Sequence, residues 1–568
     1  MLRITELRLP LDHPPEALRA AVLRRLKLAD AELAELQVFK RSYDARKKSA
    51  IVLIYTVDCG LKPGLDGANV LARQAPDPQL RPSPDTQYRP VAQAAPGFPT
   101  DGQLRPVVVG FGPTGLFAAL VLAQMGLRPI VLERGPEVRQ RTKDTWALWR
   151  QGVLNPESNV QFGEGGAGTF SDGKLWSQIS DPRHLTRKVL TEFVAAGAPD
   201  EILFVAKPHI GTFRLVGVVE KMRHDIIAMG GELRFGQRVV DLELETLPER
   251  AGTPERHQVR GLTLASGEQI RSNHVVLALG HSARDTFAML HARGVFMEAK
   301  ALSIGFRIEH PQSLIDKARF GPNAGHPILG AADYKLVHHA GNGRAVYSFC
   351  MCPGGTVVAA TSEPGRVVTN GMSQYSRNER NANAGIVVGI TPQDYRQDGL
   401  AGGARSDAVH PLDGIAFQRF WESRAFELGG GSYAAPAQLV GDFIKGQRSA
   451  VLGGVEPSYQ PGVQLTDLGQ HGHSALPDYA IDAIREALPA FERQIKGFSM
   501  TEAVLTGVET RTSAPLRITR GRDHQSVNVR GLYPAGEGAG YAGGIMSAGV
   551  DGIEVAESLA RSMLGWAA

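Results

Sequence analysis

The N-terminal residues show the hydrophobic patterns of a small α/β unit. Residues 3–11 (RITELRLPL) alternate between polar and apolar positions, as a half-buried strand does. Residues 16–28 (EALRAAVLRRLKL) carry apolar side chains at helical spacing, and residues 49–59 (SAIVLIYTVDC) form an apolar run typical of a buried strand. These patterns predict a small α/β domain over residues 1–60.

Hydrophobic runs from about residue 105 onward predict a larger α/β domain. Residues 105–135 read as a short apolar strand, a glycine-rich turn, an apolar helix and a second strand that ends at Glu133. A helix and a strand pair follow over residues 218–245, and a buried strand after residue 274 breaks at Gly280. This order of elements is typical of a Rossmann-type domain.

Proline and glycine content divide the rest of the chain. Residues 62–106 hold nine prolines, so we predict a linker without a core of its own over residues 61–104. We expect residues 105–295 and 501–568 to form one discontinuous Rossmann-type domain. Residues 296–500 are then an inserted α+β domain that covers the substrate.

The turn over residues 110–115 (GFGPTG) has the G-x-G-x-x-G spacing of a dinucleotide-binding turn. In such a turn Gly110 bends the chain, Gly112 lets the main chain approach a pyrophosphate, and Gly115 lets the helix pack on the strand. The free N–H groups and the positive end of the helix then bind the phosphates. Glu133 follows Gly115 by 18 residues, where an acidic side chain accepts the ribose hydroxyls of FAD or NAD.

A second glycine-rich run, residues 531–552 (GLYPAGEGAGYAGGIMSAGVDG), contains eight glycines and ends in a helix-like apolar segment. Main chain without side chains can approach a ligand closely. Because FAD is too long for one glycine turn, we predict that residues 110–115 bind its pyrophosphate and residues 536–545 its flavin end. A helix that begins near Gly544 would place its positive end by the flavin N1–C2 carbonyl region, where reduced flavin is negative.

Several stretches carry a resemblance to a known family. They are GFGPTGLFAALVLAQMGLRPIVLERG, SNVQFGEGGAGTFSDGKL, YSFCMCPGG, TNGMS, GVETRTSAPLRI and GLYPAGEGAGYAGGIMSAGVDG. From about Arg105 to the C-terminus the chain resembles a broad bacterial family of poorly characterised FAD-dependent dehydrogenases, or NAD(P)/FAD-dependent oxidoreductases. The resemblance implies a glutathione-reductase-type FAD-binding fold and brings no established substrate.

The glycine pattern and the resemblance together predict the FAD-binding residues. The resemblance implies that the loop over residues 161–175 (QFGEGGAGTFSDGKL) passes near the ribityl chain and ring, and that Val239 brings its main chain to the adenine. The predicted set is Gly110, Gly112, Pro113, Thr114, Gly115, Glu133, Arg134, Gly165, Gly166, Gly168, Val239, Gly280, Gly536, Glu537, Gly543, Gly544 and Ile545.

Two cations are candidates for catalysis. Lys174 is either a cation near the flavin or substrate, or a surface lysine. Arg511, within residues 507–520 (GVETRTSAPLRITR), either clamps an anionic substrate or stabilises reduced flavin, or else belongs to a salt-bridged strand.

Cys350 and Cys352 alternate onto one face of a predicted strand before a Pro-Gly-Gly turn. A flavin-linked dithiol would ordinarily have C-x-x-C or C-x4-C spacing, and no zinc-type spacing includes these residues with His338 and His339. We therefore expect buried structural thiols and no metal site.

Composition narrows the class of protein. The 568 residues are 43% hydrophobic and 21% charged, as in a soluble globular protein, and a net charge of +4 does not by itself indicate nucleic acid. Three cysteines and a charged N-terminus suit neither a disulfide framework nor a signal peptide, so we predict a cytoplasmic protein. Residues 106–127 lack charge, but their Pro/Gly breaks argue against a membrane span.

These observations favour an FAD-dependent oxidoreductase that transfers hydride between flavin and an unidentified small-molecule substrate. Outside the segments assigned to FAD there is no further G-x-G-x-x-G pattern, so NAD(P)H, if it is a transient electron donor, would dock in the open cleft. Two alternatives stay open: a flavoprotein that acts on tRNA through its locally basic N-terminal unit, and a non-enzymatic flavin-bound sensor or scaffold. The sequence leaves the oligomeric state undecided.

Overall fold

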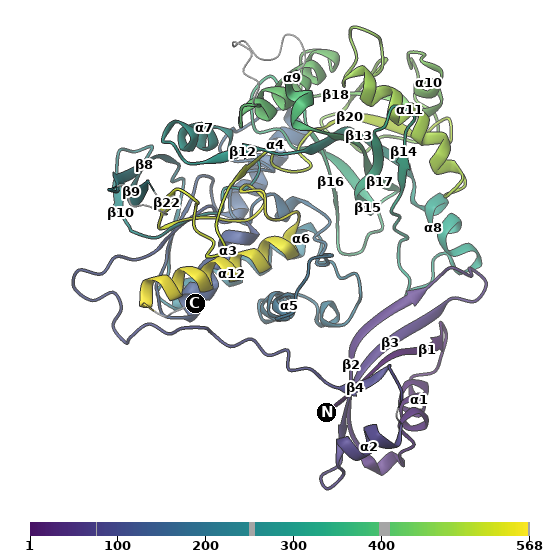
Figure 1. Ribbon diagram of the computed structural model, residues 1–568. Helices are drawn as coiled ribbons and strands as arrows, with labels where there is room; N and C mark the ends of the chain where they lie inside the picture. Colours follow the sequence, from purple (N-terminus) through teal and green to yellow (C-terminus); the bar gives the residue numbers. More distant parts are fainter. Residues whose placement is uncertain (75, 249–255, 397–408, 566–568) are drawn as a thin grey trace.

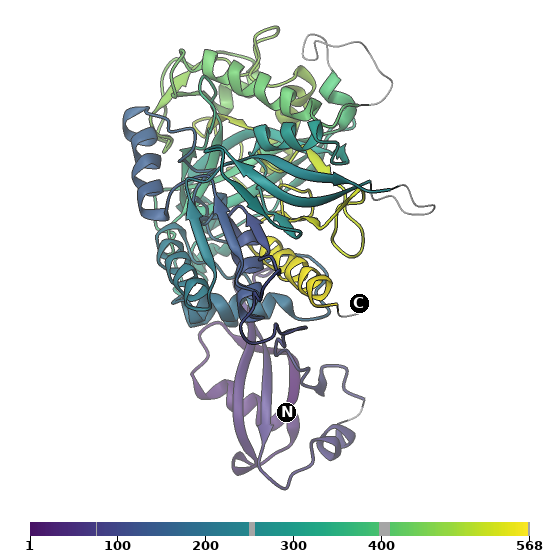
Figure 2. The ribbon, with the colours of Figure 1, turned by 90° about the vertical axis from the view of Figure 1, so that its left-hand side faces the viewer.

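The computed structural model describes residues 1–74, 76–248, 256–396 and 409–565. It has three parts: an N-terminal unit, a parallel-sheet domain and an inserted domain built on a mostly antiparallel sheet. In Figure 1 the inserted domain lies at the top and the N-terminal unit at the lower right, and Figure 2 shows this unit as a separate lobe. The predicted α/β class, with a discontinuous Rossmann-type domain, is confirmed.

The N-terminal unit is a four-stranded antiparallel sheet in the order β2-β3-β1-β4, with two helices. Leu2, Ile4 and Val57 are buried because alternate side chains of a strand face the same side. The elements are β1 (Leu2–Pro10), α1 (Glu16–Leu26), β2 (Leu33–Asp44), β3 (Val52–Leu61), α2 (Gly67–Arg73) and β4 (Leu80–Pro82).

The segment 61–104, which we predicted to be a linker, contains α2 and β4. The Asp66 carboxylate accepts a hydrogen bond from Ala68 N and so caps α2. Strand β4 pairs with β1, and Pro82 is tolerated there because β4 is an edge strand. The proline content therefore led us to miss a helix and a strand, and the extended linker begins only after Pro82.

The Rossmann-type domain has a five-stranded parallel sheet in the order β23-β11-β5-β6-β7. Val108, Val131 and Val276 face the helices on one side, while Val107 and Leu132 face a second sheet. Burial on both faces explains why these short strands are continuously apolar. The strands are β5 (Val107–Val109), β6 (Ile130–Glu133), β7 (Glu232–Phe235), β11 (Val275–Leu277) and β23 (Leu532–Pro534).

Helix α12, from the C-terminal part of the chain, packs on α3 and α5, and α3 packs on α6. The approach of α12 to α3 is close: a Cβ on Gly552 would lie 2.3 Å from Thr114 O. This packing makes the two distant parts of the chain one domain. The helices are α3 (Pro113–Gln124), α4 (Val138–Gln151), α5 (Leu185–Ala195), α6 (Thr212–Ala228), α7 (Arg284–Ala292) and α12 (Ile545–Leu564).

The second sheet of this domain has four strands, with β9 between β8 and β10 and also paired with β22. The helix and the two strands predicted within residues 218–245 are confirmed as α6, β7 and β8, but the two strands do not pair with each other: β7 pairs with β6, and β8 pairs with β9. The strands are β8 (Val239–Thr246), β9 (His257–Leu264), β10 (Gln269–Arg271) and β22 (Val529–Arg530).

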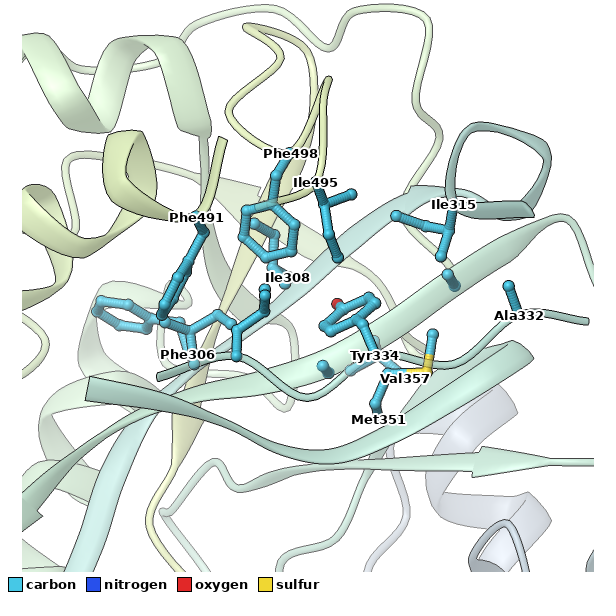
Figure 3. Packing of buried hydrophobic residues seen from close by; sticks show 14 of the residues in the cluster. Phe306, Ile308, Ile315, Ala332, Tyr334, Met351, Val357, Phe491, Ile495 and Phe498 are labelled. Carbon is cyan, nitrogen blue, oxygen red and sulfur yellow. The ribbon is translucent and has the colours of Figure 1, made fainter. Parts of the chain in front are cut away.

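The inserted domain is built on an eight-stranded sheet in the order β14-β15-β17-β13-β20-β18-β19, with β16 beside β15. Phe306 and Ile308 of β13 pack with Tyr334, Phe491 and Phe498 in its core (Figure 3). The strands are β13 (Leu302–Pro311), β14 (Val337–His339), β15 (Ala345–Ala359), β16 (Thr369–Ser373), β17 (Asn381–Ile390), β18 (Ala435–Leu439), β19 (Val463–Leu465) and β20 (Val504–Glu509). The helices are α8 (Gln312–Phe320), α9 (Asp413–Leu428), α10 (Val440–Lys445) and α11 (Asp478–Glu492).

Strand β20 lies beyond the predicted domain boundary at residue 500, but it pairs with β13 and β18. The chain returns to the Rossmann-type domain only through the two-stranded ribbon of β12 (Met297–Ala299) and β21 (Leu516–Ile518). Residues 510–515 therefore cross between the two domains.

Candidate active site

Three glycine-rich segments meet at one place. A Cβ on Gly166 would lie 2.7 Å from Gly112 Cα, and a Cβ on Gly168 would lie 3.0 Å from Ile545 Cγ1. A Cβ on Gly536 would lie 2.2 Å from Thr114 Oγ1. The loop 161–175 thus lies against the N-termini of both α3 and α12, as the predicted site requires.

Both helices begin at a glycine, Gly112 for α3 and Gly544 for α12, so no side chain caps either helix end. Their first N–H groups and the positive helix ends are available to an anion. On Gly280, Gly543 and Gly544, a Cβ would meet no atom within 4 Å, so these main-chain positions face open space. Bare main chain next to two uncapped helices is suited to a large, partly anionic ligand.

The Glu133 carboxylate lies at the end of β6, where it is buried. Its Oε1 accepts hydrogen bonds from Gly135 N at 2.9 Å and Gly163 N at 3.0 Å, and its Oε2 accepts one from Phe111 N at 2.9 Å. A carboxylate offers about four lone pairs. Oε2 therefore keeps one acceptor position for a ribose hydroxyl, while the other bonds position the glycine turn and loop.

A buried arginine that the sequence did not reveal holds this loop from behind. The Arg141 guanidinium, on α4, is fully buried and donates to the carbonyl oxygens of Asn159, Val160 and Glu164 at 2.7–2.9 Å. Burial lowers the pKa of Arg141 to about 10, although the charges of Glu133 and Glu164 oppose this shift. The guanidinium therefore still carries its charge at neutral pH. No motif marks this residue, because its partners are main-chain atoms.

The remaining predicted FAD residues fall into three groups. Gly110 and Gly115 are required by packing, because a Cβ on Gly115 would lie 1.9 Å from Gly110 O and one on Gly110 would lie 2.3 Å from Ala278 O. Arg134 stacks over Phe162 and pairs with Glu157 and Asp285. Asp285 also pairs with Arg238, the residue before Val239, so Arg134 and Val239 lie at the same end of the domain. Pro113, Gly165 and Gly166 lie at the meeting point of the glycine segments.

Lys174 is not a simple surface lysine. Its ammonium group donates to the carbonyl oxygen of Met351 in β15 and lies 3.2 Å from Asp172 Oδ2. Burial lowers the pKa of Lys174, but the charges of Asp172, Cys352 and Cys350 together outweigh burial and raise the pKa above its ordinary value. Lys174 is therefore a fixed cation where the glycine loop meets the inserted domain.

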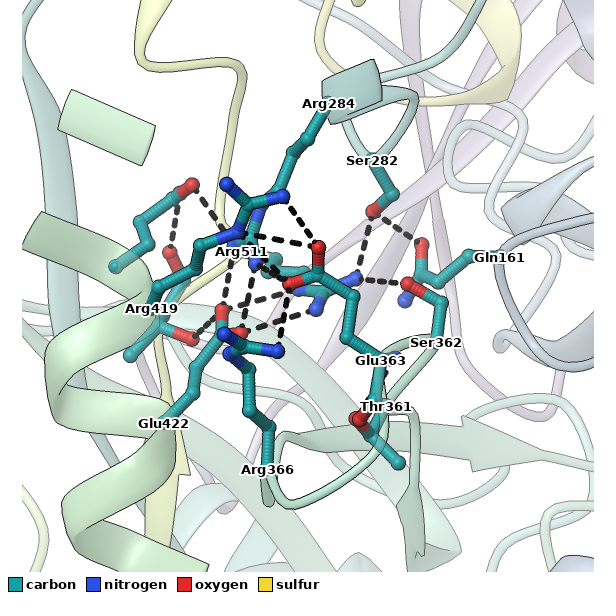
Figure 4. A network of polar contacts seen from close by, with 12 residues as sticks. Gln161, Ser282, Arg284, Thr361, Ser362, Glu363, Arg366, Arg419, Glu422 and Arg511 are labelled. Carbon is teal, nitrogen blue, oxygen red and sulfur yellow. Dashed lines mark hydrogen bonds and ion pairs between the residues drawn. The ribbon is translucent and has the colours of Figure 1, made fainter. Parts of the chain in front are cut away.

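Arg511 is fully committed to other protein groups. Its guanidinium forms ion pairs with Glu422 of α9, and it donates to Ser282 Oγ at 3.1 Å and Ser362 Oγ at 2.7 Å (Figure 4). Arg284 of α7 pairs with the same Glu422 carboxylate. In this structure Arg511 ties the two domains together, which is the salt-bridged alternative. The sequence had not marked Glu422 or Arg284.

Glu537 lies in the turn before α12, and its side chain is partly exposed. Among the described residues its carboxylate has no hydrogen-bond partner. Burial raises its pKa to about 7; the Lys300 charge opposes the rise and the Cys350 charge adds to it. It is therefore a carboxyl group that can hold a proton near neutral pH at the predicted flavin end.

The comparisons with known proteins agree with this geometry. Residues 301–512 match a family described as "FAD-dependent protein, C-terminal domain-like", and residues 1–60 match a domain of unknown function. Over 559 residues, 98% of each chain, the protein is 45% identical to an uncharacterized protein of Clostridium beijerinckii. The chain belongs to the same family as this Clostridium protein. FAD is its cofactor.

Two solved structures show a distant likeness. CtdE in complex with FAD is 12% identical, with 81% of this chain and 88% of that chain covered and a TM-score of 0.27. A geranylgeranyl bacteriochlorophyll reductase-like protein of Thermoplasma acidophilum is 12% identical, with 81% and 79% covered and a TM-score of 0.33. Because these scores are low, the fold assignment rests on the strand order above.

The site fits FAD in its chemistry. The uncapped N-terminus of α3 suits the pyrophosphate, and the spare acceptor of Glu133 suits the adenosine ribose. The open main chain at Gly543 and Gly544, with the N-terminus of α12, suits the flavin end. The family's cofactor and the donor set of this chain are therefore consistent.

Glu133→Gln is expected to weaken FAD binding about 10- to 100-fold and to lower the unfolding free energy by about 1–3 kcal/mol. In the variant, the side-chain NH₂ group would face a main-chain N–H group from which the Glu133 carboxylate now accepts a hydrogen bond. FAD titration and denaturant unfolding of the FAD-free protein measure the two effects. Glu232→Gln, at a partly exposed ion pair with Arg105, is the control and should change neither by much. Unchanged FAD affinity in Glu133→Gln would show that Glu133 does not contact FAD.

Three further observations concern the basic N-terminal unit, metal ions and membranes. Some arginines of the N-terminal unit form ion pairs, among them Arg3 with Asp58 and Arg19 with Asp30, and in its basic segment Arg46 pairs with Asp44. Within the described ranges no group of three or more metal-ligating side chains occurs. None of the described helices has both the length and the apolar character to cross a bilayer.

Proposed function

We propose that the protein is an FAD-dependent dehydrogenase or reductase that transfers hydride between flavin and a small-molecule substrate. The observation that carries the proposal is that the inserted domain meets the flavin end of the site: Lys174 of the glycine loop bonds to Met351 of β15, and Glu537 is close enough to Cys350 to feel its charge. A substrate between these elements would lie against the flavin, away from bulk water.

FAD, when bound, supplies the two-electron chemistry, and the chain supplies binding and electrostatics. The N-terminus of α12 would stabilise negative charge on the flavin pyrimidine ring. Lys174, held by Asp172, would attract an anionic group of the substrate. Glu537 would hold or release a proton near neutral pH, because burial raises its pKa to about 7.

NAD(P)H is the electron donor we propose, as a ligand that docks transiently. The G-x-G-x-x-G patterns of the chain, residues 110–115, 163–168 and 538–543, all lie in segments that FAD occupies in the proposal. A nicotinamide would then enter from the solvent side of the flavin, in place of the substrate, as expected for a reductase that uses one face for both half-reactions.

An anaerobic spectral experiment tests the proposal. The purified protein, loaded with FAD, is mixed in turn with NADH, NADPH and a panel of metabolites, and the flavin absorbance is followed. Bleaching by a nicotinamide or a metabolite is the expected result. The sensor or scaffold alternative would be favoured if FAD binds at normal stoichiometry and dithionite reduces it, but none of these compounds bleaches it.

A further inference from the structure

Strand β15 is irregular where Cys350, Met351 and Cys352 follow one another. Its register against β17 shifts between Phe349 and Cys352, and shifts again between Cys352 and Gly355. Cys350 has φ 41°, in the left-handed region that residues other than glycine rarely adopt. Bulges of this kind redirect individual side chains and are common beside active sites. The expected Pro-Gly-Gly turn is instead part of the bulged strand.

The bulge brings the two thiols together. In a regular strand the Cα atoms of residues i and i+2 are roughly 6.6 Å apart, near the upper limit of about 6.8 Å for a disulfide. Here the chain turns at Cys350, and Cys352 Sγ lies 3.3 Å from Cys350 O. The two thiols are close enough for each to shift the pKa of the other. The C-x-C spacing is therefore compatible with a disulfide at this bulge.

Two cations lie beside the pair. Lys174 donates to Met351 O, between the cysteines, and Arg307 Nη1 donates to Cys350 O at 2.9 Å. The hydrogen bond from Cys352 lowers the pKa of Cys350 well below its usual 9.0; burial opposes this, and the charges of Lys174 and Arg307 assist it. The same hydrogen bond raises the pKa of Cys352. A thiolate beside a neutral thiol is the arrangement of an attacking and a resolving cysteine.

Carboxylates paired with both cations weaken this field, but the pKa of Cys350 stays lowered. Asp172 is paired with Arg377 as well as Lys174, and Glu509 is paired with Arg307 at 2.6 Å. Burial raises the pKa of Glu509 to about 7, although the Arg307 charge opposes the rise. The cationic environment of Cys350 is thus built from groups that already hold one another in place.

The pair faces the flavin end of the site. Lys174 ends the glycine loop that contacts Pro113 and Ile545 through Gly168. The charge of Cys350 contributes to the raised pKa of Glu537, in the turn before α12. Cys350 is partly exposed, whereas Cys352 is fully buried. A partly exposed cysteine with a buried partner is the arrangement that an electron relay needs.

We propose that Cys350 and Cys352 are a redox-active dithiol that exchanges two electrons with FAD. The inference rests on the proposed function, because it requires bound FAD. In the oxidative direction the Cys350 thiolate and the Cys352 thiol lose two electrons and form an S–S bond. Oxidised FAD takes up both electrons and the Cys352 proton. In the reverse direction, two electrons from reduced FAD reduce the disulfide to the dithiol. The fully reduced protein therefore stores two electrons in the dithiol in addition to the two in its flavin.

Electron counting tests the proposal. Full-length, FAD-loaded protein is oxidised with ferricyanide, desalted and titrated anaerobically with dithionite. The wild-type protein should take up about four electron equivalents per FAD, and Cys350→Ser and Cys352→Ser about two. Cys59→Ser is the matched control and should keep about four, because Cys59 is buried in the N-terminal unit, away from the site. An uptake of about two by the wild-type protein would overturn the proposal.

A second measurement needs no variant and no flavin. Full-length FAD-free protein, either oxidised with ferricyanide or reduced, is denatured and labelled with N-ethylmaleimide, and its peptides are weighed. The oxidised sample should lack the label at Cys350 and Cys352 and keep it at Cys59. Labelling of all three cysteines after oxidation would overturn the proposal.

The two proposals fail in different ways. Protein that binds no FAD refutes the proposed function, and its lack of colour shows this before any titration. Protein whose FAD is bleached by NAD(P)H or a metabolite, but which takes up only about two electrons, refutes the dithiol and leaves the proposed function intact.

Discussion

Gly112→Asp is expected to abolish FAD binding while leaving the fold intact. Gly112 has φ −77°, and a Cβ on it would meet only Gly166 Cα, at 3.5 Å, so the free protein can accommodate a side chain. A carboxylate there would face the pyrophosphate. Two like charges about 4 Å apart, at an effective dielectric constant of about 20, repel by about 4 kcal/mol, roughly a thousandfold in affinity. Calorimetric titration with FAD measures the loss.

The same variant separates ligand binding from folding. Asp is a favoured N-cap residue, so the FAD-free variant should unfold at the wild-type temperature or above it. Gly112→Ala controls for size without charge and should lose less affinity than Gly112→Asp. Retention of FAD by Gly112→Asp at normal stoichiometry would refute the assignment of the pyrophosphate to this turn.

Glu422→Ala is expected to lower the unfolding free energy by about 3–5 kcal/mol. The Glu422 carboxylate is fully buried and accepts from Arg284 at 2.7 and 2.9 Å and from Arg511 at 3.0 and 3.1 Å. Its removal leaves two buried guanidinium groups without their shared counter-charge. Glu427→Ala, at an exposed position of the same helix, should change stability by no more than about 0.5 kcal/mol. Denaturant unfolding of the FAD-free proteins measures the unfolding free energy of both variants. Equal losses in Glu422→Ala and Glu427→Ala would contradict the role of Glu422.

The Glu422 cluster also predicts a pH dependence. Burial raises the pKa values of Glu422 and Glu363, but neighbouring arginines outweigh it and hold both below the usual 4.5, that of Glu363 at about 2. A depressed carboxyl pKa stabilises the fold above the unfolded value and loses this effect as the pH falls. The unfolding free energy of the wild-type protein should therefore decrease from about pH 4.5 toward pH 2. Glu422→Ala should show a smaller decrease over that window, and an equal decrease would place the titrating groups elsewhere.

The predictions that succeeded rest on short-range patterns. The G-x-G-x-x-G turn, the apolar strands beside it and Glu133 at the end of β6 are local features, and the physics of a tight turn and a helix N-terminus requires them in that order. The linker prediction failed in part because α2 and β4 are stabilised by Asp66 and by pairing with β1, which composition does not report. The boundary at residue 500 failed because β20 joins a sheet whose other strands lie far away in the sequence.

The sequence by itself determined the Rossmann-type turn, the elements that flank it and the positions of the glycine segments, because these are local patterns of apolar residues and glycine. Only the tertiary structure decided what the charged and sulfur-containing residues do. It bound Arg511 to Glu422, fixed Lys174 against β15, and used a bulge to bring Cys350 to Cys352. The physical reason is that a buried charge or thiol takes its properties from partners that folding brings close, and no spacing along the chain specifies those partners.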